Sequence, residues 1–266
     1  MPSTSDKGLT LFVFEGAKTE DNFVRSLKQH FLDAGHTIEC VYGAEIYQLY
    51  ESIKEDELVH DIVTLLQDRV DNKQVLENHP RDSFAEVYLF FDYDAHATKA
   101  DDDKIREMLS VFDNETENGK LYISYPMVEA LRHYTDRKSF RQLTVKCKRG
   151  KNCPSQNACT EKETCLKEPH YKQIVTETSA PQLSNINKYT PSTWKELITA
   201  HLYKMNDLVH DVFDFPQDLC SQQDIFSKQK EKHIDHRCPQ VAVLSAFPIY
   251  VLDYYGLKKL QDKLNE

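Results

Sequence analysis

Acidic residues follow two of the most apolar segments of the chain, and their types and spacing suit a divalent cation. Glu15 comes directly after the run Leu9–Phe14, and Asp92 and Asp94 follow the run Glu86–Phe91. Carboxylate oxygens are the ligands that Mg²⁺ and Mn²⁺ prefer in proteins. Carboxylates held close together repel each other, and a cation between them keeps both ionised. These residues therefore predict a metal site, although the two aspartates could instead be a solvated strand end that caps the next helix.

The glycine after Glu15 adds to this motif. Gly16 permits a tight turn from a strand into a helix and lets a ligand approach the backbone. On its own, the segment Glu15–Glu20 could equally be the capping turn of that helix. It is not an ATPase-type phosphate-binding loop, because no glycine stands at the required position before Gly16. A similar strand end occurs at Ser124–Glu129, where Glu129 either adds a carboxylate or is a first-turn helix residue.

Strand and helix patterns alternate through the first half of the chain. Short apolar runs indicate strands, and apolar residues repeated at helical spacing indicate helices. The expected strands are Leu9–Phe14, His36–Tyr42, Glu86–Phe91 and Lys120–Ser124. The expected helices run from Thr19 through Phe31, over Leu58–Val70, over Asp101–Phe112, and from a first turn containing Pro126 through Val128 to Tyr134. This order predicts an α/β fold with a mostly parallel sheet flanked by helices, in which ligands bind beyond the carboxyl ends of the strands.

The second half of the chain has a different character and is expected to be mainly helical. It contains a polar, cysteine-rich segment at Phe140–His170 and a segment of loop composition at Ser179–Ser192. Helices are expected at Trp194–Val212 and Gln222–His233, and the apolar stretch Val241–Tyr255 contains Pro248, which predicts a kinked or broken helix. We therefore divide the chain into residues 1–136, which hold the acidic motifs, and residues 137–266, a cysteine-containing insert with a helical C-terminal region.

Four of the seven cysteines are spaced at regular intervals of six: Cys147, Cys153, Cys159 and Cys165. They are candidate ligands for Zn²⁺, although zinc sites usually have tighter Cys-x-x-Cys pairs. Reduced thiols, an iron–sulfur cluster or a redox sensor are the alternatives. Further candidate ligands are His170, His233, His236 and Cys238. The basic residues around the first two cysteines either guide a phosphate backbone or form a solvated loop; they are Lys146, Lys148, Arg149 and Lys151.

The composition bounds the setting and the partners. With 40% hydrophobic and 29% charged residues among 266, the chain resembles an ordinary globular protein. No apolar run reaches the roughly 20 residues that span a bilayer, and the first residues lack the apolar region of a secretory signal. We therefore expect a cytoplasmic protein without a membrane partner. Because the formal net charge is −10, any grip on nucleic acid must be local, use metal ions or come from a partner chain.

Together the acidic motifs resemble a known family. A strand ending in Glu-Gly, followed by a later strand ending in Asp-x-Asp, is typical of the toprim domain of topoisomerases, primases and OLD-type nucleases. The strings FVFEGAKTEDNF, LFFDYDAH and ISYPMVEAL look especially like those of RloB-like, OLD-related toprim proteins of bacterial phage-defence systems. The resemblance covers roughly residues 9–135, about half of the chain.

The resemblance implies a Rossmann-like toprim catalytic domain in residues 1–136. If this chain works as those nucleases do, Glu15, Asp92 and Asp94 would bind one or two Mg²⁺ or Mn²⁺ ions. The ions would activate water and stabilise charge on the scissile phosphate. Glu20 and Glu129 match further acidic positions of such nucleases. Glu15 would be a metal ligand or a general base. The substrate would be DNA, or tRNA or another RNA.

The resemblance also implies a cellular role. Related proteins often act beside an ABC-type ATPase in systems that shut down an infected cell, and the chain has no Walker motif of its own. One alternative is a non-catalytic, toprim-like interaction subunit bound to such an ATPase. Another is a strand-handling enzyme of the primase or topoisomerase kind. The choice of DNA or RNA, the trigger and the oligomeric state, a homo-oligomer included, stay open.

Overall fold

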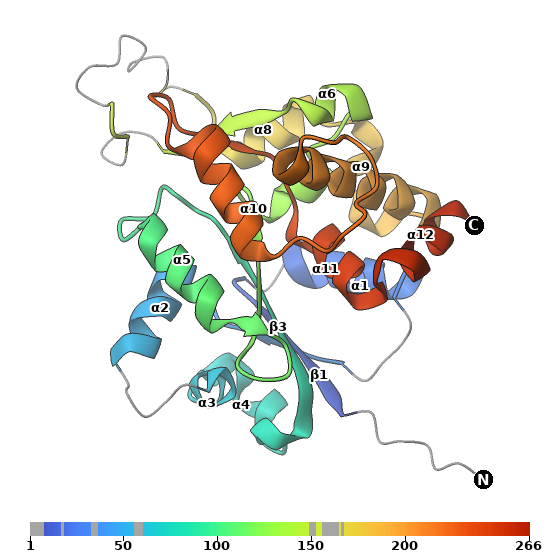
Figure 1. The fold of residues 1–266 in the computed structure, drawn as a ribbon. Helices are drawn as coiled ribbons and strands as arrows, with labels where there is room; N and C mark the ends of the chain where they lie inside the picture. Colours follow the sequence, from blue (N-terminus) through green and yellow to red (C-terminus); the bar gives the residue numbers. More distant parts are fainter. Residues whose placement is uncertain are drawn as a thin grey trace.

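A mostly parallel sheet with helices on both faces forms the centre of the molecule (Figure 1). The computed structural model describes residues 8–16, 19–32, 37–55, 61–148, 153–155, 165 and 168–266. Within these residues the sheet has five strands in the order β2-β1-β3-β5-β4. The parallel strands are β1 (Leu9–Phe14), β2 (Thr37–Val41), β3 (Phe84–Asp92) and β5 (Gly119–Ser124), and β4 (Asp113–Asn114) pairs antiparallel with β5. The predicted α/β fold with a mostly parallel sheet flanked by helices is confirmed.

The strands form where apolar residues run without interruption, because both faces of the sheet are covered. Leu11–Phe14 of β1 and Val87–Asp92 of β3 are buried throughout. Gly119 begins β5 at a φ of 112°, and a Cβ there would lie 2.7 Å from Leu89 Cδ1. Only glycine lets β5 start this close to β3 in that conformation.

Helices from both halves of the chain cover the sheet. On one face, α1 (Thr19–His30) lies beside α11 (Ala246–Tyr255), and α9 (Pro191–His210) packs behind both. On the other face, α2 (Ile46–Glu55) and α5 (Asp102–Val111) pack together, and α10 (Gln222–Gln229) packs on α5. Two short helices, α3 (Ile62–Gln67) and α4 (Val70–Leu76), lie near the edge strand β2.

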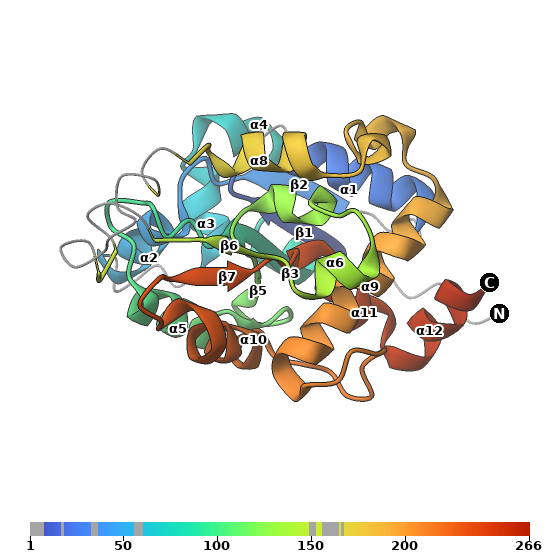
Figure 2. The same ribbon diagram turned by 90° about the horizontal axis from the view of Figure 1, so that it is seen from above.

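The remaining elements connect these layers. The short helices are η1 (Arg81–Ser83), η2 (Val128–Arg132), α6 (Arg137–Arg141), α8 (Tyr171–Thr178), η4 (Pro181–Leu183), η5 (Ile186–Lys188), the π-helical turn η6 (Lys230–Ile234) and α12 (Leu257–Asn265). A second small sheet pairs β6 (Thr144–Lys146) antiparallel with β7 (Gln240–Ala242), as Figure 2 shows. None of the helices in the described part of the chain combines the length and apolarity needed to cross a membrane.

Three of the expected helices differ from those in the structure, and two of them lie in the first half of the chain. After Pro126 the chain forms only the short 3₁₀ helix η2, because Met127 is still extended (φ −151°, ψ 170°). The helix expected at Leu58–Val70 is α3 alone within the described residues; Arg69 is extended and a separate helix, α4, begins at Val70.

The stretch Val241–Tyr255 is not a kinked helix. Its first residues belong to β7, and α11 starts afresh at Ala246. Pro248 is the third residue of α11, where a backbone N–H has no partner within the helix. Proline therefore fits there without bending the helix.

Both halves of the chain contribute to the same hydrophobic core. Phe247 of α11 stacks on Phe90 of β3 with 5.0 Å between ring centroids, and Tyr250 meets Phe12 of β1 edge-on at 5.4 Å. The boundary near residue 136 is therefore crossed by core packing, and residues 137–266 supply one wall of the core.

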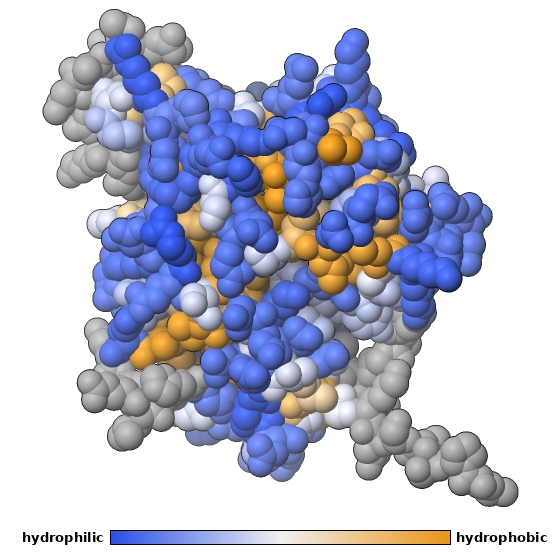
Figure 3. Space-filling view, in the orientation of Figure 1, coloured by the Kyte–Doolittle hydropathy of each residue, from blue (hydrophilic) through white to orange (hydrophobic). Residues whose placement is uncertain are grey.

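The face seen in Figure 3 is mainly hydrophilic, with small hydrophobic patches between polar side chains.

Candidate functional site

Glu15 and Asp92 meet at the carboxyl ends of two neighbouring parallel strands. Glu15 follows β1, and its backbone N–H donates to Phe90 O at 3.2 Å. Its side chain reaches over to β3, where the N–H of Asp92 donates to Glu15 Oε2 at 3.0 Å. The two acidic residues expected at this edge are therefore brought together by the sheet itself.

Glu20 lies in the first turn of α1 and is buried, with 7% of its surface exposed. The N–H of Gly16 donates to Glu20 Oε1 at 3.3 Å, so this side chain closes the turn between β1 and α1. The charges of Glu15 and Glu20 are close enough for Glu20 to raise the pKa of Glu15. Glu20 thus belongs to the same acidic group as Glu15.

Glu129 of η2 is also buried, with 3% of its surface exposed. Its Oε1 lies 3.3 Å from Lys172 Nζ. Its Oε2 is buried, and no hydrogen-bond partner for it is found in the described part of the chain. The backbone of Val128 lies close enough to Asp92 to lower the pKa of its carboxyl. Glu15, Glu20, Asp92 and Glu129 are called the acidic cluster below.

Burial and mutual repulsion raise the pKa values of this cluster. Burial is the largest cause of the rise in the pKa of Glu15 to about 7; the N–H of Asp92 opposes it, and the charges of nearby carboxylates add to it. The pKa of Asp92 is raised well above its usual range by burial and by the charges of Glu15, Glu20 and Glu129. Burial also raises the pKa of Glu20, although the N–H of Gly16 and the charge of Lys172 act against it. At neutral pH the cluster therefore favours binding of protons or a cation.

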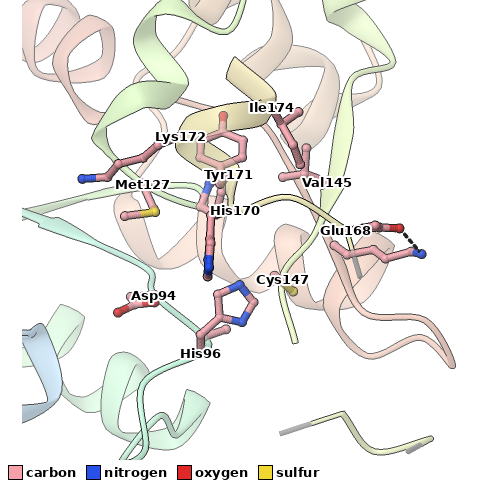
Figure 4. A pocket seen from close by; sticks show the side chains of 13 residues that line it. Asp94, His96, Met127, Val145, Cys147, Glu168, His170, Tyr171, Lys172 and Ile174 are labelled. Atoms are coloured by element: carbon pink, nitrogen blue, oxygen red, sulfur yellow. Dashed lines mark hydrogen bonds and ion pairs between the residues drawn. The ribbon is translucent and has the colours of Figure 1, made fainter. Parts of the chain in front are cut away.

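Asp94 is placed differently from the expectation. Strand β3 ends at Asp92, so the two aspartates are not alternate residues of one continuing strand. Asp94 has a φ of 26°, and its backbone N–H points to Pro126 O at 3.4 Å. Its half-buried side chain lines a cavity beside the cluster (Figure 4). Its charge still raises the pKa of Glu15, so it acts on the cluster from the rim.

Two further charged residues join the site without having been expected. Glu45, which precedes α2, raises the pKa of Glu15 by its charge. Glu45 lies shortly after β2, a third strand whose carboxyl end is at the same edge of the sheet, and this position could have identified it from the sequence. Lys172 of α8 pairs with Glu129 from a segment 43 residues later in the sequence, and no motif around it pointed to this site.

Comparisons with known proteins add no relative. No family model, curated protein or solved structure matches this chain. The toprim resemblance therefore rests on the sequence motifs, and the family stays a prediction.

The acidic cluster suits a hard divalent cation in its donor chemistry. Its donors are carboxylate oxygens, as Mg²⁺ and Mn²⁺ prefer, and Glu129 Oε2 is a buried acceptor without a protein partner in the described residues. Among those residues, no three histidine, cysteine, aspartate or glutamate side chains already converge closely enough to ligate a metal ion. Binding would therefore require the carboxylates to turn toward the ion.

The cysteine segment lies only partly within the described residues, and Cys159 falls outside them. Cys147 is buried, and burial raises the pKa of its thiol to about 12, which disfavours the thiolate that binds zinc. Cys153 lines a separate cavity with His236 and Arg237. The zinc site stays a prediction.

The basic residues near these cysteines are held by acidic partners where the structure describes them. Lys146 Nζ lies 2.6 Å from Glu168 Oε1, and Lys148 Nζ lies 2.7 Å from Asp102 Oδ2. Arg149 and Lys151 fall outside the described residues. A phosphate backbone would have to compete with these ion pairs for the two lysines.

Proposed function

We propose that this chain is a metal-dependent nuclease, an Mg²⁺- or Mn²⁺-dependent hydrolase of phosphodiester bonds. The observation that carries the proposal is that Glu15, Glu20 and Glu129, from separate segments, lie close enough to Asp92 at the end of β3 to raise its pKa by their charges. Strongly raised pKa values of this kind cluster at functional sites, where burial and like charges are combined.

The carboxylates of the cluster would bind the ion. Asp92 lies within reach of the charges of the other three carboxylates, and Glu129 would offer its Oε2, for which the described part of the chain supplies no hydrogen-bond partner. When bound, Mg²⁺ supplies a charge that lowers the pKa of water and neutralises charge on phosphate oxygens. Asp94 lies at the rim and would contact the ion through a shift of its side chain or through water.

Glu15 and Lys172 suit two further needs of hydrolysis, which are the removal of a proton from water and the stabilisation of negative charge on the phosphate. Glu15 Oε2 accepts the N–H of Asp92 at the edge of the cluster, so Glu15 would serve as a metal ligand or as general base. The ammonium group of Lys172 stands beside Glu129 and is mostly exposed, so it can contact a phosphate oxygen.

A cleavage assay tests this proposal. The purified chain is incubated with single-stranded DNA, duplex DNA and tRNA in Mg²⁺ or EDTA. We expect cleavage in Mg²⁺ alone, and a loss of about 100-fold or more in rate for Glu15→Gln and Asp92→Asn. The control is Glu117→Gln, which changes an exposed carboxylate in the turn between β4 and β5. This variant should cleave like wild type. Cleavage that persists undiminished in both cluster variants would refute the site.

The toprim resemblance extends the proposal to a cytoplasmic effector of antiphage defence that acts with an ABC-type ATPase. Affinity purification of the tagged chain from its own cells, with identification of any ABC-type ATPase that is retained, tests the partnership. Growth arrest of phage-infected cells that requires Asp92 would support the effector role.

A non-catalytic interaction subunit is the second candidate. It is favoured by the lack, within the described residues, of side chains already arranged around a metal position. In that case the cluster would be held by shared protons, and neither Mg²⁺ binding nor cleavage would be detected while the chain still bound its ATPase partner.

A further inference from the structure

A cavity of about 590 Å³ opens beside the acidic cluster. It lies between the segment after β3, the segment before η2, β6 and the start of α8. Asp94 and Lys172 line the cavity, as Figure 4 shows. Both also act on the cluster, so the cavity and the cluster are neighbours. Its volume falls within the range of roughly 300–1,000 Å³ that is usual for ligand sites.

The cavity walls combine apolar side chains with flat rings. Met127, Val145 and Ile174 supply apolar surface, and Tyr171 adds an aromatic ring. The hydroxyl of Tyr171 is hydrogen-bonded to His133 Nδ1 at 3.0 Å, which fixes the ring in place. This wall is therefore formed before any ligand arrives.

Two imidazoles complete the lining. His96 comes from the loop after β3 and His170 from the residue before α8, and both project into the cavity in Figure 4. Imidazole rings can stack on a flat heterocycle and can donate or accept hydrogen bonds at its edge. The charged pair Lys146–Glu168 lies on the rim.

The charge of the chain bears on which ligand fits. With a net charge of −10 and acidic side chains at the site, contacts to a phosphate backbone can supply only part of the affinity for nucleic acid. Stacking and apolar contact with a base do not depend on a basic surface. A base can enter such a cavity only when it is unpaired or has left the duplex stack.

We propose that this cavity binds one unpaired nucleobase of the strand whose phosphate lies at the acidic cluster. This inference rests on the proposed nuclease function and names its substrate class, a single-stranded or locally unpaired nucleic acid. Met127, Ile174 and Tyr171 contact the base, and the imidazoles of His96 and His170 meet its face or edge. Lys172 stands where the backbone of the strand passes from the cavity to the cluster.

Equilibrium binding tests the inference independently of cleavage. The full chain carrying Asp92→Asn, so that the strand stays intact, is titrated into a short single strand containing 2-aminopurine, into its duplex, and into the same strand with one abasic site. The comparison is repeated with Ile174→Trp, which fills the cavity, and with Thr176→Trp, an exposed position on the same helix. Circular dichroism and the melting temperature verify that each variant is folded.

We expect the single strand to bind at least about 10-fold tighter than the duplex, with a change in 2-aminopurine fluorescence. Ile174→Trp should weaken binding roughly 5- to 100-fold, the range for loss of one base contact, whereas Thr176→Trp should stay within about 2-fold of the parent. Equal binding of single strand, abasic strand and duplex would overturn the inference, as would a cavity that binds free mononucleotides but no strand.

The two proposals fail in different ways. If wild type cleaves single strand and duplex equally and Ile174→Trp does not change this, the base site is refuted and the nuclease stands. If wild type does not cleave but the single strand is still bound through the cavity, the nuclease is refuted and the base site stands.

Discussion

At the scale of single residues, the surroundings of Glu15 make ionisation of its carboxyl group unfavourable. Its carboxylate is drawn into a site where burial and neighbouring negative charges disfavour ionisation, and one backbone N–H only partly compensates. The protonated form is therefore favoured in the folded protein relative to the unfolded chain.

The stability of the metal-free protein should depend on pH through this residue. The pKa of Glu15 is about 7 in the folded state against a usual value of 4.5. Because the folded pKa is the higher one, its contribution to stability is fully present below pH 4.5 and is lost as the pH rises through 7. In EDTA, the free energy of unfolding measured by urea denaturation should fall from pH 4.5 to pH 7.5, with Glu15 contributing on the order of 3 kcal/mol.

The matched variants separate Glu15 from other titrating groups. Glu15→Gln removes one titrating carboxyl and should make the pH dependence shallower, with the part due to Asp92 and Glu20 remaining. Glu117→Gln, at an exposed residue, should leave the curve as in wild type. A wild-type protein that becomes more stable from pH 5 to pH 8 in EDTA, to the same extent as Glu15→Gln, would contradict the assigned role.

The sequence predicted residues of the site only where a strand marked their position. Glu15 and Asp92 were identified because each directly follows or ends an apolar run, and strand ends meet at one edge of a parallel sheet. Asp94 was expected on a continuing strand, but β3 stops two residues earlier. Lys172 could not be found from sequence, because its place beside Glu129 depends on how α8 packs across η2.

At the scale of elements, α9 depends on a cap at its first turn. Thr190 and Thr193 form a reciprocal capping box, and Pro191 occupies the first helical position. The cap fixes the start of a helix whose Trp194 donates its indole N–H to Ser26 Oγ of α1 at 3.0 Å. The start of α9 thus holds α1 in place, and α1 carries Glu20.

Thr190→Ala should destabilise the protein by about 1 kcal/mol, because the backbone N–H of Thr193 loses the hydroxyl that accepts its hydrogen bond. Chemical denaturation measures this loss, and Thr176→Ala, an exposed threonine within α8, is the control, expected within about 0.5 kcal/mol of wild type. A Thr190→Ala protein as stable as the control would show that the cap contributes nothing.

Local patterns predicted most elements of the first half and fewer of the second. Short apolar runs correctly predicted β1, β3 and β5, because runs of this length are typical of strands and too short for most helices. Val241–Tyr255 was misassigned because the residues of β7 and α11 are apolar throughout, so periodicity could not separate the strand from the helix. Pro248 is tolerated by its place in the first turn, which sequence alone did not fix.

Phe247 is the element-scale contact that joins the C-terminal helices to the sheet. Its ring is 1% exposed and lies between Phe23 of α1 and Phe90 of β3. Phe247→Ala should lower the free energy of unfolding by about 3–5 kcal/mol, through lost burial and the cavity left behind. The control is Leu219→Ala at a half-exposed leucine, expected to cost about 1 kcal/mol or less. Equal losses in the two variants would contradict this packing.

At the scale of the whole molecule, the acidic half depends on the second half for its core. Tyr122 of β5 donates its hydroxyl to Asp253 Oδ2 of α11 at 2.7 Å, and the rings of α11 cover the aromatic face of β1 and β3. The division at residue 136 was drawn from composition, which reports polarity along the chain and not which segments pack together.

Residues 1–136 expressed alone should therefore fail to fold stably. Without α11 the fragment exposes Phe12, Phe90 and Tyr122 to water, a patch large enough to promote aggregation. Circular dichroism with urea denaturation is the measurement, and the intact chain is the reference. A soluble fragment with a cooperative transition would show that the first half is an independent domain.

The central claim is that the acidic cluster holds a divalent cation, and titration calorimetry with Mn²⁺ and Mg²⁺ tests it most directly. Wild type at pH 7.5 should bind one or two ions, Asp92→Asn and Glu129→Gln should weaken binding at least about 10-fold by removing a charged ligand, and Glu117→Gln should bind like wild type. Binding that is undetectable in wild type, or equal in wild type and both cluster variants, would contradict the claim.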